Sequence, residues 1–529
     1  MAFVITQNCC TDASCVPACP VDCIRPVPGE DGVEAPMLYI DPETCVDCGA
    51  CAEVCPVDAI YHEDELPNDQ TRFRDVNAAY FAARPLAIRS TTPPRSQDPV
   101  QREPLRVAVV GTGPAACYAV SDLVRTRGVE VNVFEQLPTP YGLIRFGVAP
   151  DHQRTKDVIH EFESAFAHRD VRCFFNVAVG RDISHAELST HHDAVIYAVG
   201  APRSLELGIP GEQLAGSHAA ADVVGWYNGH PGRAGDDLDL SGPRAVIVGN
   251  GNVALDVARV LVMNHDDLVT TDVADHALAR LWRSGIEEVV VMGRRGAADA
   301  AFSVGELLAL GNLRDVDVVV EGDIGDRPDG FERALKYDVI VEYAVRPRRA
   351  GNRRIVLRFG SRPVRFAGQD RVEGLVIEDR SGTTTIATPL VLRSIGYRGT
   401  PIDGLPFDDA TGIVPNEGGR VMRDRAPVPG VYVTGWIKRG PRGVIGTNKT
   451  CARETVANLV SDARAGILPT APSNTASLAA LISSRRLNVI DWPGWRCIDA
   501  FERQRGTEVS RPRVKVIDID ALLAAATAG

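Results

Sequence analysis

Four short apolar runs in the chain have the length of buried β-strands. They span residues 106–110, 129–134, 244–248 and 287–292. A glycine turn and a stretch of helical apolar period follow the first run and again the third. This alternation predicts two α/β units of the Rossmann type, each with a parallel sheet. No apolar run approaches the roughly 20 residues needed to cross a bilayer, so we expect no membrane partner.

The first strand-to-helix turn carries a dinucleotide-binding fingerprint. Gly111 makes the turn, Gly113 lets the backbone approach a pyrophosphate, and Ala116 allows the helix to pack closely on the strand. The next strand ends in Glu135, and an acid at this place accepts hydrogen bonds from ribose hydroxyls. The pattern therefore predicts a site for an unphosphorylated ADP moiety, as in FAD.

A second fingerprint follows, and its partner strand ends differently. The turn comprises Gly249, Asn250, Gly251, Asn252 and Val253. The partner strand ends in Arg294 and Arg295, two guanidinium groups in place of an acid. Arginine forks match the 2′-phosphate of NADP and would gain nothing from NAD. We predict an NADP site here; the alternative is an ordinary solvated arginine pair.

Seven cysteines near the N-terminus have the spacing of iron–sulfur ligands. Residues 45–56 read C-x2-C-x2-C-x3-C-P, a run in which the fourth cysteine ligates a second cluster. One predicted set is Cys19, Cys45, Cys48 and Cys51, and the other is Cys9, Cys15 and Cys55. A structural zinc ribbon is the alternative, but four cysteines within eleven residues favour iron–sulfur chemistry.

Charge is distributed very unevenly along the chain. Residues 1–66 hold thirteen Asp or Glu and one basic residue, Arg25, a net charge of -12. The remaining residues balance at 56 basic and 56 acidic, which argues against a nucleic-acid partner. We expect the acidic segment to face a basic docking surface; a merely solubilising role is the alternative. Nine of the thirteen cysteines lie in the first 55 residues, which is no disulfide framework and favours a reducing cytoplasm.

Two segments carry no recognisable chemistry. Residues 83–104 lack any strand or helix period and contain Thr91-Thr92-Pro93-Pro94, which predicts a linker. Residues 466–529 contain no functional motif. A docking tail and a surface cap fit this second segment equally well.

Longer motifs resemble two known families. Residues 2–82 are similar to the seven-iron bacterial ferredoxins, which hold one three-iron and one four-iron cluster. Residues 105–465 resemble the adrenodoxin-reductase-like branch of the ferredoxin-NADP reductases. The motifs that carry this second resemblance lie at 140–152, 249–259, 293–296 and 434–449. Taken together, the chain resembles the fused bacterial ferredoxin/ferredoxin-NADP reductases.

The resemblance implies an α+β ferredoxin-like iron–sulfur domain followed by α/β Rossmann-type FAD and NADP domains. The implied boundaries are 1–66 for the two-cluster domain, 67–104 for its tail and the linker, 105–201 and 397–465 for the FAD domain, 202–396 for the inserted NADP domain, and 466–529 for a C-terminal extension. A strand at 430–435 would return the chain to the FAD domain after the insertion.

The implied cofactors are FAD, NADP(H), one 4Fe-4S cluster and a further 3Fe-4S or 4Fe-4S cluster. The gap from Cys9 to Cys15 is shorter than the usual family spacing, and Cys10 is an adjacent spare thiol. The number of irons held by the Cys9 set is therefore left open. We expect Cys23 to be a buried cysteine that is not a ligand.

The same resemblance implies roles for single residues. Implied FAD contacts are Ala115, Glu135, Leu143 and Val179, with Trp436, Gly443, Val444 and Ile445 beside the flavin. Implied NADP contacts are Asn250 to Val253 at the pyrophosphate, Arg294 and Arg295 at the 2′-phosphate, and Glu306 and Gly443 near the nicotinamide. Candidate catalytic residues are His152, Trp436 and Glu306. The family often has a second acid one helical turn after this glutamate, where this chain has Ala309.

His152 and Asp151 match a family motif beside the flavin. Hydride transfer needs no general base, so orientation of the reactants is the favoured role for this histidine. A loop histidine with satisfied hydrogen bonds is the alternative.

The implied activity is that of a ferredoxin-NADP(+) reductase, which passes electrons from NADPH through FAD and the fused clusters to an external ferredoxin or cytochrome P450-type acceptor. A flavin is needed as converter because a hydride carries two electrons and a cluster takes one. Two alternatives are an electron-input subunit of a glutamate-synthase-type complex and a redox sensor with slow turnover.

Overall fold

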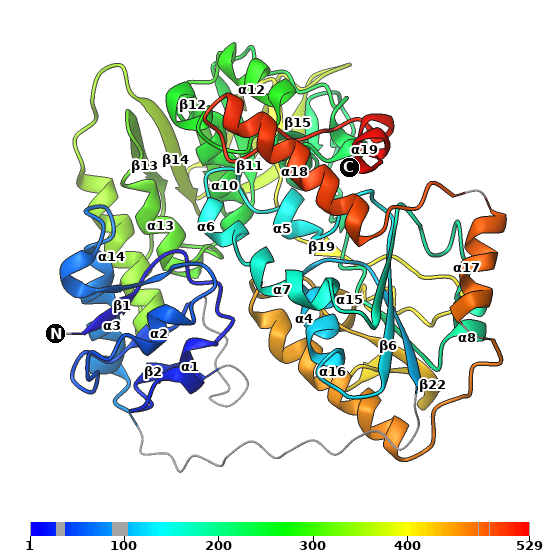
Figure 1. Cartoon of the computed structure of the whole chain (residues 1–529). Helices are drawn as coiled ribbons and strands as arrows, with labels where there is room; N and C mark the ends of the chain where they lie inside the picture. Colours follow the sequence, from blue (N-terminus) through cyan, green and yellow to red (C-terminus); the bar gives the residue numbers. More distant parts are fainter. Residues whose placement is uncertain (1, 28–36, 87–103, 474, 486, 528–529) are drawn as a thin grey trace.

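The computed structural model describes residues 2–27, 37–86, 104–473, 475–485 and 487–527 (Figure 1). Most of the predicted linker, residues 87–103, lies outside these ranges. The described chain forms a cysteine-rich lobe (residues 2–86, blue in Figure 1) and two α/β bodies, each built on a largely parallel sheet. The two sheets predicted by the apolar runs are therefore present.

The first sheet has the strand order β20-β21-β22-β8-β5-β6-β7, and the strands from β22 to β7 pair in parallel. Its strands are β5 (Leu105–Val110), β6 (Val129–Glu135), β7 (Val171–Phe175), β8 (Ala194–Tyr197), β20 (Asn416–Glu417), β21 (Arg420–Arg423) and β22 (Ala426–Val433). Helices cover both faces, α4 and α16 on one and α8 and α17 on the other. The central strands are apolar along their length because neither face meets water.

The helices of the first body are short except for the one that follows the last strand. They are α4 (Pro114–Leu123), α5 (Leu143–Phe146), α6 (Gln153–Lys156), α7 (Ile159–Phe166), α8 (His185–His191), α15 (Trp436–Arg439) and α16 (Thr447–Arg464). Helix α4 begins directly after the first glycine turn, as the fingerprint predicts. Helix α16 packs along α4 over most of its length.

The second sheet is inserted into the first body. Its strand order is β10-β18-β11-β12-β14-β13, with every pair parallel. Its strands are β10 (Ser217–Ala219), β11 (Arg244–Val248), β12 (Glu288–Met292), β13 (Val316–Gly322), β14 (Arg353–Phe359) and β18 (Leu390–Arg393). The chain leaves the first sheet after β8 and returns to it at β20, and an antiparallel pair, β9 (Arg203–Ser204) with β19 (Tyr397–Arg398), marks the crossing.

The second body also carries a small antiparallel sheet that packs on one face of the parallel sheet. Its strands are β15 (Arg362–Ala367), β16 (Gly374–Asp379) and β17 (Gly382–Ala387). The helices of this body are α9 (Ala220–Tyr227), η2 (Pro231–Arg233), α10 (Asn252–Val262), α11 (His265–Leu268), α12 (Asp275–Trp282), η3 (Ala297–Asp299), α13 (Val304–Leu310) and α14 (Phe331–Val345). None of the helices in the described ranges is long and apolar enough to cross a membrane.

The cysteine-rich lobe consists of two small hairpin-like sheets tied together by one helix. Its elements are β1 (Phe3–Ile5), α1 (Cys15–Ala18), β2 (Ile24–Arg25), β3 (Tyr39–Ile40), α2 (Ala50–Glu53), β4 (Ile60–His62), η1 (Glu63–Glu65) and α3 (Arg72–Ala83). Asn77 of α3 accepts hydrogen bonds from the backbone N–H groups of Ile5 and Ile40, at 3.3 and 2.9 Å. One buried side chain thus joins both sheets of the lobe.

The lobe packs firmly on the second body. Phe331 of α14 meets Tyr39 and Tyr80 edge-on, with ring centroids 6.0 and 5.6 Å apart. Arg72 pairs with Glu342 of α14 at 3.0 Å. These contacts continue the hydrophobic core of the lobe into that of the second body. The lobe is therefore seated in a defined place beneath α13 and α14 (Figure 1).

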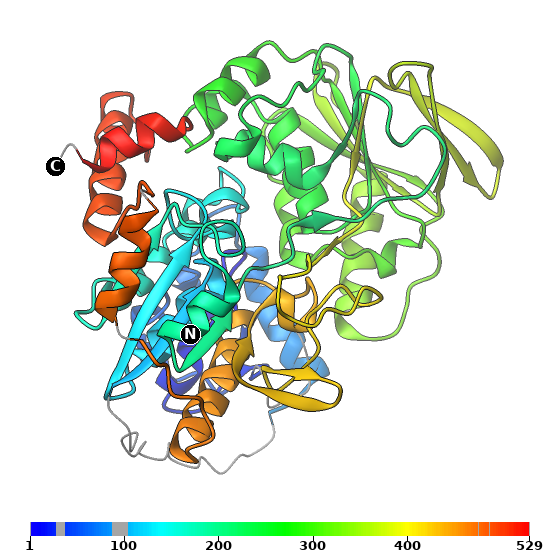
Figure 2. The ribbon, with the colours of Figure 1, turned by 90° about the vertical axis from the view of Figure 1, so that its right-hand side faces the viewer.

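The C-terminal segment ties the two α/β bodies together. Its helices are α17 (Thr475–Ser484), α18 (Trp492–Glu508) and α19 (Ile519–Ala526). Glu502 of α18 pairs with Arg145 of the first body at 2.6 Å. Beyond α18, Lys515 pairs with Asp272 of the second body at 2.9 Å, and Asp272 also pairs with Lys156 of the first body at 2.6 Å. In Figure 2 these helices run along one side of the molecule past both bodies.

Asp272→Asn should destabilise the protein strongly. Burial opposes ionisation of Asp272, but Lys156 and Lys515 hold the pKa of its carboxyl well below the usual range. The ion pairs of Asp272 therefore stabilise the folded protein fully above the unfolded pKa of about 3.9. This stabilisation is lost as the pH falls through the lowered pKa of the folded state. Removing the negative charge that Lys156 and Lys515 share leaves both buried lysines without an ion-pair partner. We expect this to lower the free energy of unfolding by about 3–5 kcal/mol. The midpoint of denaturant unfolding at pH 7 measures this loss.

The matched control for this variant is Asp275→Asn. Asp275 pairs with Arg511 across the same contact, but its side chain is 58% exposed. The carboxylate is exposed and Arg511 keeps its hydrogen bonds to the carbonyls of Thr271 and Val273, so this pair contributes about 0–1 kcal/mol and the midpoint should hardly move. Equal shifts of the unfolding midpoint in the two variants would show that the buried carboxylate of Asp272 contributes no more to stability than the exposed one of Asp275.

Candidate functional site

The two glycine turns have the same construction in both bodies. Gly111 follows β5 with a φ of 100°, and Gly249 follows β11 with a φ of 112°. A Cβ at Gly111 would lie 2.7 Å from the carbonyl oxygen of Ala198, and one at Gly249 would lie 2.0 Å from that of Ser394. Only glycine fits such a left-handed turn pressed against a neighbouring strand end.

The second glycine of each turn faces open space. Gly113 and Gly251 are the N-terminal caps of α4 and α10, and a Cβ on either would have nothing within 4 Å. No side chain caps either helix, so the first backbone N–H groups are available to an anion. Ala116 and Ala254, one turn further on, are fully buried against their sheets. Both turns therefore fit the pyrophosphate of a dinucleotide.

Glu135 lies where the first fingerprint predicts, at the end of β6. One carboxylate oxygen accepts hydrogen bonds from the N–H and hydroxyl of Thr112, at 3.0 and 2.5 Å. The other oxygen accepts from the N–H of Leu137, at 3.0 Å. Burial raises the pKa of Glu135, against these hydrogen bonds.

The other predicted FAD contacts surround the first turn to different degrees. Ala115 lies beneath Gly435, whose Cβ would come within 2.6 Å of it. Leu143 begins α5, is 48% exposed, and follows Gly142, where a Cβ would lie 3.0 Å from Gly113 Cα. Val179 lies further along, half-buried in the loop after β7.

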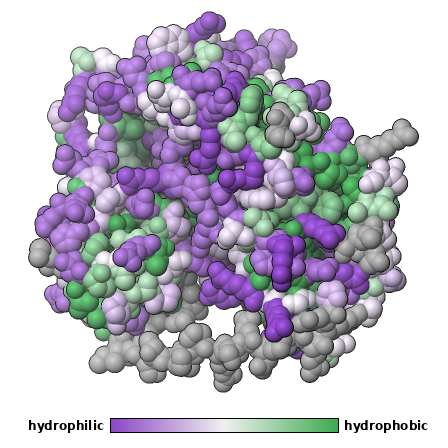
Figure 3. All heavy atoms as spheres, in the orientation of Figure 1, coloured by the Kyte–Doolittle hydropathy of each residue, from purple (hydrophilic) through white to green (hydrophobic). Residues whose placement is uncertain are grey.

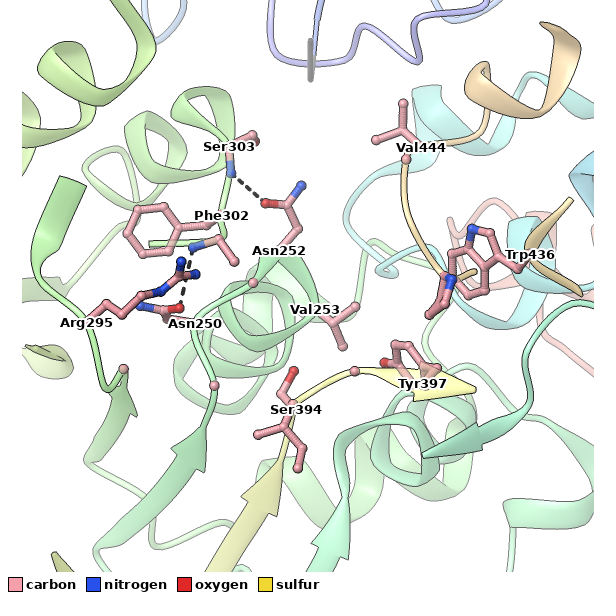
Figure 4. Close-up of a pocket in the computed structure, with 18 of the residues that line it drawn as sticks. Asn250, Asn252, Val253, Arg295, Phe302, Ser303, Ser394, Tyr397, Trp436 and Val444 are labelled. Carbon is pink, nitrogen blue, oxygen red and sulfur yellow. Dashed lines mark hydrogen bonds between the residues drawn. The ribbon is translucent and has the colours of Figure 1, made fainter. Parts of the chain in front are cut away.

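A large cavity of about 1530 Å³ opens between the second glycine turn and the segment 436–447 (Figure 4). It brings the predicted NADP residues of the second turn together with three of the predicted flavin neighbours, whereas Ala115, Glu135, Leu143 and Val179 do not line it. Among its lining residues are Gly249, Asn250, Gly251, Asn252, Val253, Arg294, Arg295, Tyr397, Trp436, Gly443 and Val444. Ile445 instead packs into the apolar cluster around α4. The cavity is large enough for a dinucleotide, because small-molecule sites are usually about 300–1,000 Å³.

The two walls of the cavity are held by local contacts. On one wall, the Asn252 side chain accepts from the N–H of Ser303 at 2.7 Å, and the Asn250 carbonyl accepts from the N–H of Phe302 at 2.9 Å (Figure 4). On the other wall, the Trp436 ring stacks parallel to Tyr397 with centroids 6.0 Å apart. The indole N–H of Trp436 donates to the Arg442 carbonyl at 3.1 Å. The turn and the indole are therefore held in place before any ligand binds.

Arg294 and Arg295 are exposed on the loop that follows β12. Both line the cavity. Neither guanidinium forms an ion pair with any residue in the described ranges. Two unneutralised arginines at the mouth of a nucleotide cavity fit a phosphate group.

His152 and Glu306 do not line the large cavity; they meet at the junction of the two bodies, around Arg259 of α10. The guanidinium lies 2.6 Å from Asp151, 2.8 Å from His152 Nε2 and 3.2 Å from Glu306. Asp256 of the same helix pairs with it at 2.8 Å. Arg259 and Asp256 were not singled out from the sequence, although they lie three residues apart in the motif 249–259.

The contact with Arg259 fixes the protonation state of His152. A guanidinium has no acceptor, so Nε2 of the imidazole must accept and the ring must be neutral, with its proton on Nδ1. Burial, assisted by Arg259, lowers the pKa of His152 in agreement with this state. Burial opposes ionisation of Asp151, yet Arg259 lowers the pKa of Asp151 to about 2. Burial raises the pKa of Asp256 to about 6.

The ligand atoms of His152, Asp256 and Glu306 lie within 4.8 Å of one another, a spacing that also suits a metal ion. Arg259 is hydrogen-bonded to all three of these groups. The positive charge that balances these acidic groups therefore comes from the guanidinium of Arg259.

The predicted four-cysteine set is gathered around one small hollow in the lobe. Cys19, Cys45, Cys48 and Cys51 line it together with Cys23. Cys23 is buried, as expected, and its Sγ lies 3.4 Å from that of Cys19. Four thiols around one hollow fit a cluster as its ligands.

The second predicted set lies on the side of the lobe that faces the reductase bodies. Burial, together with the nearby Cys55, raises the pKa of Cys9 to about 12. Burial, Cys9 and Cys55 likewise raise the pKa of Cys15. The three thiols are therefore close neighbours. Cys10, the spare thiol, is buried in the apolar cluster that surrounds α4.

The segment from Cys10 to Ser14 lies directly on the loop before α16. The N–H of Gly446 donates to the carbonyl of Cys10 at 2.7 Å, and a Cβ on Gly446 would lie 2.1 Å from the N atom of Asp12. Lys449 binds Asp12 and Ser14 at 2.9 and 2.6 Å. Thr11 itself lines the large cavity. No sequence pattern pointed to these contacts, because the partners are more than 430 residues apart.

Comparisons with known proteins agree with this arrangement. Residues 38–61 match the model of a 4Fe-4S binding domain, and residues 105–292 match that of a pyridine nucleotide-disulphide oxidoreductase. The chain is 47% identical, over its whole length and 95% of the relative, to a probable ferredoxin/ferredoxin-NADP reductase of Mycobacterium tuberculosis. The counterpart in Mycobacterium leprae is 46% identical over 99% of this chain and 98% of its own.

A solved structure matches the two α/β bodies. The structure of Mycobacterium tuberculosis FprA in complex with NADPH superposes with a TM-score of 0.75 at 42% identity, and covers 80% of this chain and all of that one. The fold is that of an FAD/NADP oxidoreductase similar to FprA, joined to a 4Fe-4S binding domain. The chain belongs to the ferredoxin/ferredoxin-NADP reductase family. The matches support FAD and NADP as cofactors and a 4Fe-4S cluster in the lobe.

Arg259→Gln should change the pH dependence of flavin reduction by NADPH. Without the guanidinium, the acids around His152 are uncompensated, so the pKa of His152 should rise and the imidazole should become protonated near neutral pH. In the unaltered protein its pKa is lowered, so we expect no titration step above about pH 6.5. The rate of flavin reduction, measured by stopped flow between about pH 5.5 and 8.5, tests this. In the variant, the titration step that belongs to His152 should lie at higher pH than in the unaltered protein.

Two further variants make this test specific. Arg259→Lys keeps the positive charge and should keep a profile close to that of the unaltered protein. Arg420→Gln removes a bidentate pair with Asp462, at 2.7 Å, which involves none of the groups bound to Arg259, and should leave the profile unchanged. Superimposable profiles for Arg259→Gln and the unaltered protein would show that Arg259 does not set the state of His152.

Proposed function

We propose that the chain is an NADPH-dependent ferredoxin reductase in which electrons pass from NADPH to FAD, then to the Cys9, Cys15 and Cys55 set, and onward through the lobe to an external acceptor. The single observation that carries this proposal is the contact between Cys10–Ser14 and Gly446–Lys449, which seats the lobe beside the cavity. FAD, when bound, converts a two-electron hydride into single electrons that clusters can carry.

The nucleotide is held by residues of the second body. The N–H groups at the start of α10, beside Asn250 to Val253, receive the pyrophosphate, and Arg294 and Arg295 bind the 2′-phosphate. Trp436, Gly443 and Val444 form the opposite wall and would lie beside the bound flavin. Glu135 and the turn at Gly111–Gly113 hold the ADP part of FAD on the first body.

His152 and Glu306 act as positioning residues in this proposal. Both are bound to Arg259, which joins the first body to α10 of the second. A neutral His152 holds no proton to give from Nε2, so its role is to keep the two bodies, and hence the two ring systems, in one orientation. Trp436 is the candidate catalytic residue that touches the flavin side of the cavity.

The onward acceptor is an external ferredoxin or a cytochrome P450-type protein. The Cys9 set holds a 3Fe-4S or a 4Fe-4S cluster, and the set that includes Cys48 holds a 4Fe-4S cluster. The family identification favours the reductase over a glutamate-synthase subunit or a slow sensor.

Anaerobic stopped-flow mixing with NADPH, with low-temperature EPR on the same sample, tests the sequence of steps: flavin bleaching should precede cluster reduction. Flavin bleaching with inert clusters would contradict it.

Arg294→Ala combined with Arg295→Ala should weaken the binding of NADPH selectively. Each guanidinium contributes about 1.5–3 kcal/mol through charge-assisted hydrogen bonds to the 2′-phosphate, so the KM for NADPH should rise about a hundredfold or more. The KM for NADH, which lacks this phosphate, should change by less than about threefold. Steady-state reduction of ferricyanide with both nucleotides measures the difference.

The matched control for this pair is Arg348→Ala with Arg349→Ala. These are also adjacent and exposed, but they lie in the loop after α14 and do not line the cavity. They should leave both KM values unchanged. An equal loss for NADPH and NADH in the Arg294 and Arg295 variant would refute the assignment of the 2′-phosphate.

Gly446→Ala should slow the reduction of the clusters without stopping the reductase. Gly446 has an ordinary φ of -68°, so alanine causes no backbone strain, but its Cβ would lie 2.1 Å from the Asp12 N atom and must displace the lobe. Stopped-flow traces should show cluster reduction slowed about tenfold or more, because positioning governs transfer within the complex. FAD content and ferricyanide reduction should be retained.

Gly235→Ala is the matched control, since Gly235 has no positive φ and a Cβ there would meet nothing within 4 Å. It should behave as the unaltered protein does. Unslowed cluster reduction in Gly446→Ala would mean that this contact is not the path of entry into the lobe.

A further inference from the structure

The two cysteine sets of the lobe face in different directions. The segment from Cys10 to Asp12 is buried against the first body, next to the cavity. Cys48, a member of the other set, is exposed to solvent. It sits in a turn formed by Asp47 and Gly49, with φ values of 57° and 73°, which carries the cysteine outward before α2 begins. One set therefore faces the reductase and the other reaches the surface.

Apolar side chains flank the exposed cysteine. Val46 is 57% exposed and Val54 is 42% exposed. They are the only large apolar residues that are exposed in the described part of the lobe. Elsewhere in the described part of the lobe such residues are buried or partly buried, in its core or against the two bodies. Figure 3 shows hydrophobic and hydrophilic residues interleaved over the lobe, on the left of the view. An apolar centre of this kind is typical of a contact surface.

Exposed acidic side chains accompany these apolar ones along residues 43–54. Glu43 and Glu53 are exposed, as is Asp47, which lies 3.3 Å from His62. The only basic residue of segment 1–66, Arg25, cannot neutralise them, because it is buried and bound to Asp22 at 2.6 Å. The surface therefore presents an uncompensated negative rim. Among the described residues, the hydrogen bonds and ion pairs of residues 43–54 all remain within the lobe.

We propose that an electron-accepting protein with a basic patch around its own redox centre docks on this exit surface, formed by Glu43, Val46, Asp47, Cys48, Glu53 and Val54. This inference rests on the proposed function and names the place where electrons leave. Each transfer at the exit surface delivers one electron to the acceptor and moves no proton, and two transfers use the pair taken from one NADPH. The acceptor is reduced while the lobe is reoxidised.

Charge complementarity favours a basic partner over a neutral or acidic one. Segment 1–66 carries the whole net charge of the chain, -12, so the field around the lobe attracts a positive surface from a distance. Redox partners need short-lived complexes with small interfaces, below about 1,200 Å², and long-range attraction compensates for the small contact area. The two valines exclude water at the centre of the contact, beside the exposed cysteine.

The experiment uses the full-length holoprotein with cytochrome c, a basic one-electron acceptor, as the probe. Glu43→Lys combined with Glu53→Lys reverses two charges of the rim. At low ionic strength kcat/KM for cytochrome c should fall about tenfold, and the difference should shrink above about 0.5 M salt, where such charges are screened. The rate at which NADPH reduces the clusters, followed in the same variant by stopped-flow absorbance, should not change.

The matched control is Asp75→Lys combined with Glu508→Lys. It makes the same change in net charge at two exposed positions outside the exit surface, on α3 and α18. Its kcat/KM for cytochrome c should change by less than about twofold. Acetylating the lysines of cytochrome c should lower its rate with the unaltered protein, and should remove the difference between that protein and the rim variant.

Three results would overturn the proposal. An equal loss in the rim variant and the control would show that net charge, and not this surface, attracts the acceptor. Unchanged cytochrome c reduction in the rim variant, with normal cluster reduction, would place the exit elsewhere. Clusters that NADPH does not reduce even in the unaltered protein would overturn the proposed function itself, and the exit surface with it; only this third result appears in the stopped-flow trace.

Discussion

The close approach of two backbone segments at Gly446 is the constraint on which the arrangement of the redox groups depends. There is no room for a side chain between Gly446 and the Cys10–Asp12 segment, and one backbone hydrogen bond of 2.7 Å joins them. Because backbone is stiffer than side chain, this contact places the Cys9 set with little freedom. Lys449 adds a largely buried ion pair to Asp12, and so couples the position of the lobe to the start of α16.

Two buried clusters of charge set the relation between the α/β bodies. Arg259 of the second body binds Asp151 and His152 of the first, and Asp272 of the second binds Lys156 of the first and Lys515 of the C-terminal segment. Such groups are costly to bury unless every charge is paired, so separating the bodies would leave charges without partners. The clusters thereby favour one spacing of the two walls of the cavity. The absence of an acid at Ala309 leaves Glu306 as the acid that α13 supplies to this junction.

The two sides of the lobe differ because its two cysteine sets are buried to different extents. One cysteine set is covered by the first body, while Cys48 of the other set lies at the surface among acidic and apolar residues. On the covered side Lys449 of α16 pairs with Asp12, whereas Glu43, Asp47 and Glu53 of the rim form no ion pair with a lysine or arginine of the described chain. The covered set therefore provides the entry, and the exposed set the exit, of the proposed electron path through the lobe. One fold of about eighty residues contains both sets.

The sequence determined by itself everything that depends on neighbours in the chain. The glycine turns, the acid or arginine pair at the strand ends and the cysteine spacing are local patterns, because turn geometry and ligand reach act over a few residues. The structure decided the rest. The cluster around Arg259, the Asp272 contact and the seat of the lobe at Gly446 join residues from distant parts of the chain. Their formation depends on how three bodies pack, and packing leaves no periodic signal in a single sequence.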